Sequence, residues 1–124
     1  MLLSESLTRE IIGAAMEVHR ELGPGLLESA YERCLMFELQ RRGIAARRQV
    51  ALPVTYKGIK LDCGYKMDVV VEEAVVLELK AVDAVDPIHV AQLMTYLRLS
   101  GLRVGLLINF NVAVLKDGIT RRVL

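Results

Sequence analysis

The chain has 124 residues, of which 53% are hydrophobic, so it can form one domain around a buried core. With 16 Lys and Arg residues against 15 Asp and Glu, the net charge of +1 excludes a strongly basic protein that coats nucleic acid non-specifically. No apolar run approaches the roughly 18 residues needed to span a bilayer, so we expect no membrane partner. Glu5, Arg9 and Glu10 stand too early for a signal peptide, and the isolated Cys34 and Cys63 favour a reducing, cytoplasmic setting.

Two helices are predicted first. Apolar residues at helical spacing predict a helix from Ser4 to about Leu22, with Ser4 or Ser6 as its cap. The Gly-Pro-Gly sequence at 23–25 breaks this pattern. A second helix follows from about Leu27 to Arg42, and Gly43 is typical of a helix C-cap. Its apolar stripe consists of Leu27, Tyr31, Cys34, Leu35 and Leu39.

Arginines cluster where this helix ends, at positions 41, 42, 47 and 48. Cations suit a helix C-terminus, because they interact favourably with its partial negative charge. The same cluster is also a candidate for contact with phosphate groups. The sequence leaves both interpretations open.

The pattern then changes to alternation, which predicts a strand from Val50 to Tyr56 and a turn at Lys57-Gly58. Further strands are expected at Leu61–Val71 and Val75–Ala81. Pro87 marks the first turn of a third helix that runs to about Ser100 before Gly101.

Two last strands follow this helix, at 104–108 and 119–123. The predicted order is therefore ααβββαββ. Because a helix separates the third and fourth strands, those two can be parallel. We expect an α/β fold with a mixed sheet flanked by helices, in a single domain spanning 1–124.

The segment MDVVVEEAVVLELK at 67–80 reads as a hairpin with its loop at 72–74. With that loop, Asp68 lies opposite Glu78, and Lys66 lies opposite Lys80. Met67, Val69, Val71, Val75, Leu77 and Leu79 then share an apolar face against the core. Like charges that face each other across two strands are destabilising, unless a divalent cation lies between the carboxylates. A lysine beside such a cation is typical of metal-assisted phosphodiester hydrolysis.

A second interpretation is that these charges face solvent. Asp68 would then form a diagonal ion pair with Lys80, and Glu78 would form one with Lys66. A loop of two or four residues would also change the register and move the acids to other faces.

Three motifs resemble a known family. Asp68, nine residues and then Glu78-Leu79-Lys80 are similar to the D…ExK signature of the PD-(D/E)XK nuclease superfamily. Residues 25–31, GLLESAY, resemble the motif of the GxxExxY protein family, which is assigned to that superfamily. QLMTYL at 92–97 and GLLINFN at 105–111 also resemble this family, so the likeness spans 7–123.

The resemblance implies a restriction-endonuclease-like core and a Mg²⁺ or Mn²⁺ cofactor. It implies that Asp68 and Glu78 are metal ligands, that the backbone carbonyl of Leu79 completes the site and that Lys80 is the catalytic lysine. Glu28 would be the acid supplied by the first core helix. Gln92 and Tyr96 match a QxxxY pattern that supports the site or the substrate in several nucleases.

Some of these residues also suit structural roles. Glu28 in a first helical turn complements the helix dipole. Tyr31 fits a core aromatic residue whose hydroxyl is hydrogen-bonded. Gln92 and Tyr96, four residues apart, share one helix face and suit an amphipathic boundary.

Two functions follow. The first is a metal-dependent nuclease that hydrolyses phosphodiester bonds in DNA or RNA. The second is a catalytically silent module that keeps the nuclease fold and binds nucleic acid or a protein partner, as a homo-oligomer. The intact set of Asp68, Glu78 and Lys80 favours the nuclease.

Overall fold

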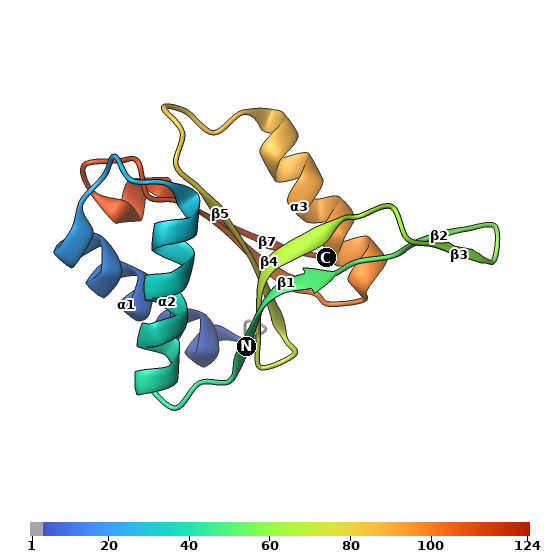
Figure 1. The fold of residues 1–124 in the computed structure, drawn as a ribbon, viewed down its shortest axis with the longest axis horizontal. Coiled ribbons are helices and arrows are strands. Elements are labelled where there is room, and N and C mark those ends of the chain that lie inside the picture. Colours follow the sequence, from blue (N-terminus) through green and yellow to red (C-terminus); the bar gives the residue numbers. More distant parts are fainter. Residues whose placement is uncertain (1–3) are drawn as a thin grey trace.

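A computed structural model describes residues 4–124, in which helices cover both faces of a five-stranded sheet (Figure 1). Residues 1–3 of the expected 1–124 domain lie outside the described residues. The elements are α1 Glu5–Leu22, α2 Glu28–Arg41, β1 Ala46–Ala51, β2 Val54–Tyr56, β3 Ile59–Leu61, β4 Lys66–Val71, β5 Val75–Lys80, α3 Pro87–Ser100, β6 Val104–Asn109, η1 Leu115–Gly118 and β7 Ile119–Val123. No described helix is long and apolar enough to cross a membrane.

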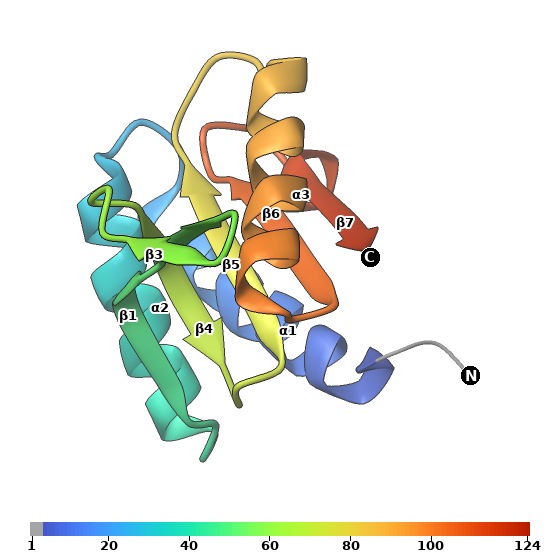
Figure 2. The ribbon, with the colours of Figure 1, turned by 90° about the vertical axis from the view of Figure 1, so that its right-hand side faces the viewer.

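The main sheet has the strand order β1-β4-β5-β6-β7. Neighbouring strands are antiparallel except β5 and β6, which are parallel and joined by α3 (Figure 2). A parallel pair needs a crossover connection, and the helix predicted at this place supplies it. The expected mixed sheet flanked by helices is therefore confirmed.

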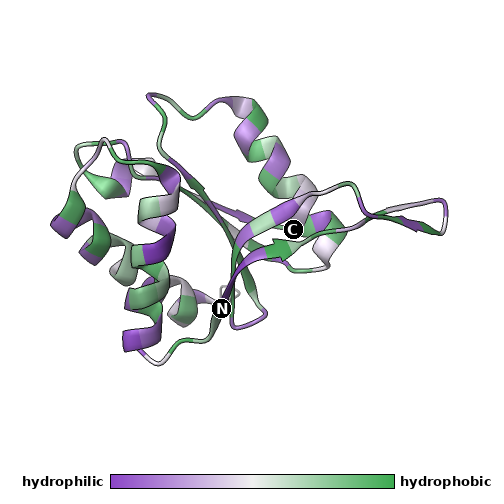
Figure 3. Cartoon of the chain, viewed as in Figure 1, coloured by the Kyte–Doolittle hydropathy of each residue, from purple (hydrophilic) through white to green (hydrophobic). Residues whose placement is uncertain are grey.

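Two hydrophobic cores lie on opposite faces of this sheet. On one face α1 and α2 pack against Val69, Leu77 and Leu106, with Tyr31 and Phe110 buried between them. On the other face α3 packs against Val70, Val76 and Leu107 through Leu93, Tyr96 and Leu97. Figure 3 shows that hydrophobic and hydrophilic residues alternate along the helices, as amphipathic helices require.

A hairpin of β2 and β3 projects from the sheet as an arm (Figures 1 and 2). The strands predicted at 50–56 and 61–71 are therefore each wrong in extent, because each divides where the arm leaves the sheet. Pro53 has no N–H to donate to the ladder. Asp62 accepts a hydrogen bond from the Gly64 N–H at 3.0 Å, which turns the chain back towards β4. The predicted turn at Lys57-Gly58 is confirmed, with φ of 49° and 82°.

The pairing of β1 with β4 has a local distortion at Gln49. The register pairs Arg48 with Val69 and Val50 with Met67, but Gln49 and Asp68 form no ladder pair. Gln49 has a left-handed φ of 52°, and the neighbouring side chains of Arg48 and Gln49 both reach Glu32 on α2, so the alternation of side chains along β1 is broken here. The prediction that Met67 shares a face with Val69 is therefore wrong, because Met67 packs in the core under α3.

The helix ends follow their sequence signals in part. Gly43, with φ 72°, closes α2, and the Ile44 N–H donates to the Leu39 carbonyl at 2.9 Å. Gly101, with φ 77°, ends α3 as expected. Ser4 precedes α1 without a side-chain capping hydrogen bond. Leu27 is wrongly placed in the apolar stripe of α2, since it is 77% exposed.

Candidate active site

The candidate site is an opening between β4 and β5. These strands pair through Val71–Val75, Val70–Val76 and Val69–Leu77, as the predicted three-residue loop requires, and the ladder then stops. Beyond the Val69–Leu77 pair, the side-chain carboxylates of Asp68 and Glu78 accept backbone N–H groups in place of backbone carbonyls. The Asp68 N–H donates to Glu78 Oε2 at 2.9 Å, and the Leu79 N–H donates to Asp68 Oδ2 at 2.8 Å. Both acids therefore occupy one opening, and each carboxylate is hydrogen-bonded to the backbone of the opposite strand.

The backbone of Leu79 faces the same opening. In a strand, the N–H and the C=O of one residue point to the same side. Because the Leu79 N–H reaches Asp68 on β4, the Leu79 carbonyl also points towards β4. The neighbouring Lys80 carbonyl points the other way and accepts the Phe110 N–H at 2.9 Å. The Asp68 and Glu78 carboxylates and the Leu79 carbonyl thus present three sets of oxygen ligands, the type that Mg²⁺ and Mn²⁺ prefer.

Burial makes the negative charges of this opening costly. Glu78 is 5% exposed, so the interpretation of these acids as solvent-facing charges is wrong for Glu78. Burial, and then the charge of Asp68, raise the pKa of Glu78 from 4.5 to about 8. Burial also raises the pKa of half-buried Asp68. A bound cation would remove this penalty, so the donor set and its electrostatics fit a divalent metal ion.

Lys80 lies at the end of β5, two residues beyond Glu78 and half-buried. Its positive charge lowers the pKa of both Asp68 and Glu78, which places the ammonium group near the two carboxylates. Lys66, predicted to lie opposite Lys80, is exposed and pairs with Ala51 of β1. Lys66 and Lys80 therefore do not face each other as predicted, and Lys80 is the half-buried lysine of the two.

Gln92 and Tyr96 approach from α3. Gln92 Nε2 donates to the Tyr96 hydroxyl at 2.9 Å, and Tyr96 is 6% exposed. Burial, followed by the negative charge of Glu78, raises the pKa of the Tyr96 hydroxyl. The ring of Tyr65, at the base of the arm, lies 6.4 Å from the Tyr96 ring. The site thus has an aromatic wall on the α3 side.

Glu28 lies apart from the other two acids. It is exposed in the first turn of α2, and its charge is among those that raise the pKa of Asp68 and Glu78. Among residues 4–124 no group of three or more His, Cys, Asp or Glu side chains gathers closely enough to hold a metal ion. Glu28 therefore stands near the site without joining the carboxylate pair in one ligand group.

Two functional neighbours escaped the sequence analysis. Glu32, 5% exposed, lies one helical turn after Glu28, and its charge raises the pKa of Asp68. The four-residue spacing from Glu28 was the signal that could have identified it. Asn109, 3% exposed, exchanges hydrogen bonds with Val82 at 3.1 and 2.9 Å and so fixes the chain just after Lys80.

Tyr31 has the structural role that its alternative interpretation assigns to it. Its hydroxyl donates to the Gly23 carbonyl at 2.6 Å and accepts the Leu26 N–H at 3.1 Å. Its ring stacks on Phe110 with centroids 4.4 Å apart. Tyr31 therefore fastens the turn before α2, which sets where α2 and its Glu28 begin.

Comparison with known proteins agrees with this geometry. The family model described as the PD-(D/E)XK nuclease superfamily matches residues 5–122. No curated protein and no solved structure gives a significant match. The matched region contains the opening between β4 and β5, with its two acids and its lysine, and the fold is of the restriction-endonuclease-like α/β type. The chain belongs to the PD-(D/E)XK nuclease superfamily.

Proposed function

We propose that the protein hydrolyses phosphodiester bonds in nucleic acid with the help of Mg²⁺ or Mn²⁺. The observation that carries this proposal is the pair of hydrogen bonds across the opened ladder, in which the Asp68 N–H donates to Glu78 and the Leu79 N–H donates to Asp68. A divalent cation would offset the two negative charges of these buried carboxylates, which lie beside a lysine. Membership of the nuclease superfamily supports the same substrate class.

Each residue has a distinct role in this proposal. Asp68, Glu78 and the Leu79 carbonyl hold the cation. Glu28, at the start of α2, acts on it through water, because it stays outside the carboxylate pair. A divalent cation bound here would neutralise the scissile phosphate and lower the pKa of a water molecule.

Lys80 holds the attacking water beside the phosphorus atom and stabilises negative charge as it develops on the phosphate. Its ammonium group can donate hydrogen bonds to the water and to the phosphate oxygens. Tyr96, oriented by Gln92, limits access of water to Glu78 from the α3 side. These two residues support the site and take no part in bond cleavage.

Nuclease activity in the presence of Mg²⁺ or Mn²⁺ tests this mechanism. Single- and double-stranded DNA and RNA are the substrates, and Lys80→Ala is compared with Lys116→Ala, which changes an exposed lysine beside the C-terminal end of α1. We expect Lys80→Ala to lower the cleavage rate about a hundredfold or more, because it removes transition-state stabilisation. Equal activity in wild type and Lys80→Ala would refute the mechanism.

Calorimetric titration with Mn²⁺ separates the enzyme from a catalytically silent module. The wild type should bind the ion, and Asp68→Asn should bind it at least about tenfold more weakly, because a charged ligand is lost. Absence of binding at millimolar Mn²⁺ would favour the silent module.

Two finer assignments accompany this proposal. Membership of the GxxExxY group is supported by Gly25, Glu28 and Tyr31, of which Tyr31 fastens the turn before α2. A homo-oligomeric state stays a prediction, which light scattering of the purified protein tests.

A further inference from the structure

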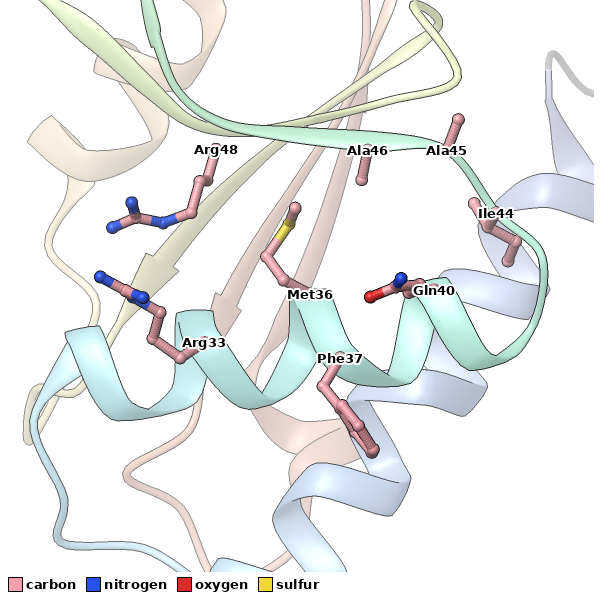
Figure 4. A pocket seen from close by; sticks show the side chains of 8 residues that line it. All are labelled: Arg33, Met36, Phe37, Gln40, Ile44, Ala45, Ala46 and Arg48. Atoms are coloured by element: carbon pink, nitrogen blue, oxygen red, sulfur yellow. The ribbon is translucent and has the colours of Figure 1, made fainter.

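A pocket of about 490 Å³ lies between α2 and β1, the edge strand of the sheet (Figure 4). Its volume falls within the range typical of small-molecule sites. None of the proposed metal ligands lines this pocket. It is therefore a separate feature, and its chemistry has to be explained by its own side chains.

One end of the pocket is cationic. Arg33 from α2 and Arg48 from β1 extend their guanidinium groups towards this same end (Figure 4). Arg48 forms an ion pair with Glu32 at 2.8 Å. The exposed Arg33 side chain makes no hydrogen bond or ion pair with any of the residues 4–124. Arg48 is thus paired with a carboxylate and Arg33 is not, so excess positive charge faces the pocket.

Arg48 is held in place before any ligand arrives. Glu32, buried at 5% exposure, accepts the Arg48 Nε–H at 2.9 Å and the Gln49 amide at 2.6 Å. Gln49 reaches this position through its left-handed φ of 52°, a conformation that costs free energy in a residue with a side chain. A strained residue and a buried acid that fix one surface arginine are typical of a pre-organised binding site.

The remainder of the pocket is suited to a flat, partly apolar group. Met36 and Ile44 line it, and Phe37 contributes a ring that is 58% exposed. Gln40 adds a side-chain amide that can donate and accept hydrogen bonds. Aromatic and apolar side chains next to arginines are the combination that holds unpaired bases and their phosphates.

The pocket lies next to the candidate active site in the sheet. Glu32 holds Arg48 at the cationic end of the pocket. Arg48 pairs in the sheet with Val69, the residue that follows Asp68. A strand whose phosphate lies at Asp68 and Glu78 therefore has a cationic site close by on the α2 side.

We propose that the pocket between α2 and β1 binds one nucleotide of a single-stranded nucleic acid, next to the nucleotide whose phosphate is cleaved. Arg33 and Arg48 contact its phosphate, and Met36 and Phe37 contact its base. Arginine suits this role because its planar fork makes two parallel hydrogen bonds to phosphate oxygens. This assignment rests on the proposed function for the identity of the strand, but its binding test does not require cleavage.

Arg33 is the residue to change, because its exposed side chain supports no contact in the fold. Arg33→Gln removes the charge, Arg33→Lys keeps the charge without the fork, and Arg9→Gln is a charge-matched control on α1, where the side chain is 77% exposed. The measurement is fluorescence anisotropy of a short labelled single strand, as DNA and as RNA, in EDTA at several salt concentrations. Adenosine monophosphate serves as a competitor.

We expect Arg33→Gln to bind the strand about tenfold more weakly than Arg9→Gln, because it loses a charge-assisted phosphate contact. Its slope of log affinity against log salt should be shallower by about 0.7, as expected for one phosphate contact on a single strand. Arg33→Lys should restore the slope but only part of the affinity.

Equal affinities and slopes for Arg33→Gln and Arg9→Gln would overturn the proposal. If Arg33→Gln weakened the binding of adenosine monophosphate but left the binding of the strand unchanged, the assignment to a strand would be overturned. The pocket would then serve a free nucleotide. The outcome is distinct from that of the proposed function. Binding that depends on Arg33 without cleavage that depends on Lys80 refutes only the hydrolysis, and the reverse refutes only this pocket.

Discussion

The Glu78 carboxyl group is buried beside a second carboxylate, and its pKa is raised from 4.5 to about 8. A carboxyl group with a raised pKa in the folded state favours folding while it is protonated. Its contribution is fully present below about pH 4.5, and it is lost as the pH rises towards 8. The raised pKa of Asp68 acts in the same direction. The metal-free protein should therefore lose stability on the alkaline side.

Glu78→Gln tests this pH dependence. The amide oxygen of Gln can still accept the Asp68 N–H, but the side chain no longer ionises. Between about pH 5 and pH 8, the free energy of unfolding of the wild type should fall by several kcal/mol more than that of Glu78→Gln. Urea denaturation in EDTA at both pH values measures the difference. If the stability of the wild type and of Glu78→Gln depended on pH in the same way, the pKa of Glu78 would not be raised in the folded state.

Tyr31 supports a second prediction at this scale. Tyr31→Phe keeps the ring stacked on Phe110 but leaves the Gly23 carbonyl and the Leu26 N–H without their partner. We expect the free energy of unfolding to decrease by about 2 kcal/mol, because buried polar groups lose a hydrogen bond. Tyr56→Phe, at a position 59% exposed, is the matched control and should change it by less than about 0.5 kcal/mol. Similar losses in both variants would contradict this role.

Single residues could be predicted where local pattern determines their place. Counting outward from the loop at 72–74 correctly brought Asp68 and Glu78 to neighbouring positions, because the three-residue loop fixes the register. Glu32 and Arg48 could not be associated in this way. They lie on different elements and meet because α2 packs along β1. Periodicity within one element does not predict such a contact between two elements.

At the scale of elements, the passage from β6 to β7 depends on Gly118. A Cβ atom at this position would collide with the backbone carbonyl of Asn109, which cannot move without breaking its strand. Gly118→Ala should therefore lower the free energy of unfolding by about 3 kcal/mol, at the upper end of overpacking costs. Thermal or urea denaturation gives the value.

Gly13→Ala is the control for this prediction. A Cβ atom there meets Nη1 of Arg42 at 3.0 Å, the mobile end of a long side chain. Alanine also favours a helix interior by about 1 kcal/mol over glycine, so Gly13→Ala should cost little or nothing. A loss as large as that of Gly118→Ala would show that space at Gly118 is not the cause.

Elements with strong terminal signals were predicted well. Pro87 and Gly101 delimit α3, and the last strand begins and ends where the pattern placed it. The arm was missed because alternation continues from Val50 to Tyr56 without showing where the strand changes its partner. Alternation reports which side chains share a face, but it carries no information on the neighbouring strand.

At the scale of the whole molecule, the arm should be removable. Leu52 and Tyr65 stand side by side where it departs, since the Leu52 N–H donates to the Tyr65 carbonyl at 2.9 Å. A variant in which Asn-Gly replaces residues 53–64 would close β1 and β4 as a hairpin with a favoured two-residue turn. Because Tyr56 and Ile59 are 59% and 60% exposed, the free energy of unfolding should change by no more than about 1 kcal/mol. Loss of cooperative urea denaturation would show that the arm belongs to the core.

The overall architecture could be predicted from the order in which helical and strand-like spacing of apolar residues follow each other along the chain. Helical spacing, then alternation, then the helix at 87–100 allow a parallel crossover, and this restricts the topology to few possibilities. The sequence pattern did not predict that Met67 packs in the second core, under α3. Met67 pairs with Val50, directly after the break in the ladder at Gln49 and Asp68, and no local sequence pattern reveals this break.

Because the candidate site is made by interrupting a ladder, the proposed activity and the stability of the fold place opposite demands on these two strands. Replacement of both acids by valine would let β4 and β5 zip up further and would remove two carboxyl groups that resist burial. The two acids therefore make the metal-free fold less stable than its sheet alone would allow, and the proposed metal ion would offset that cost.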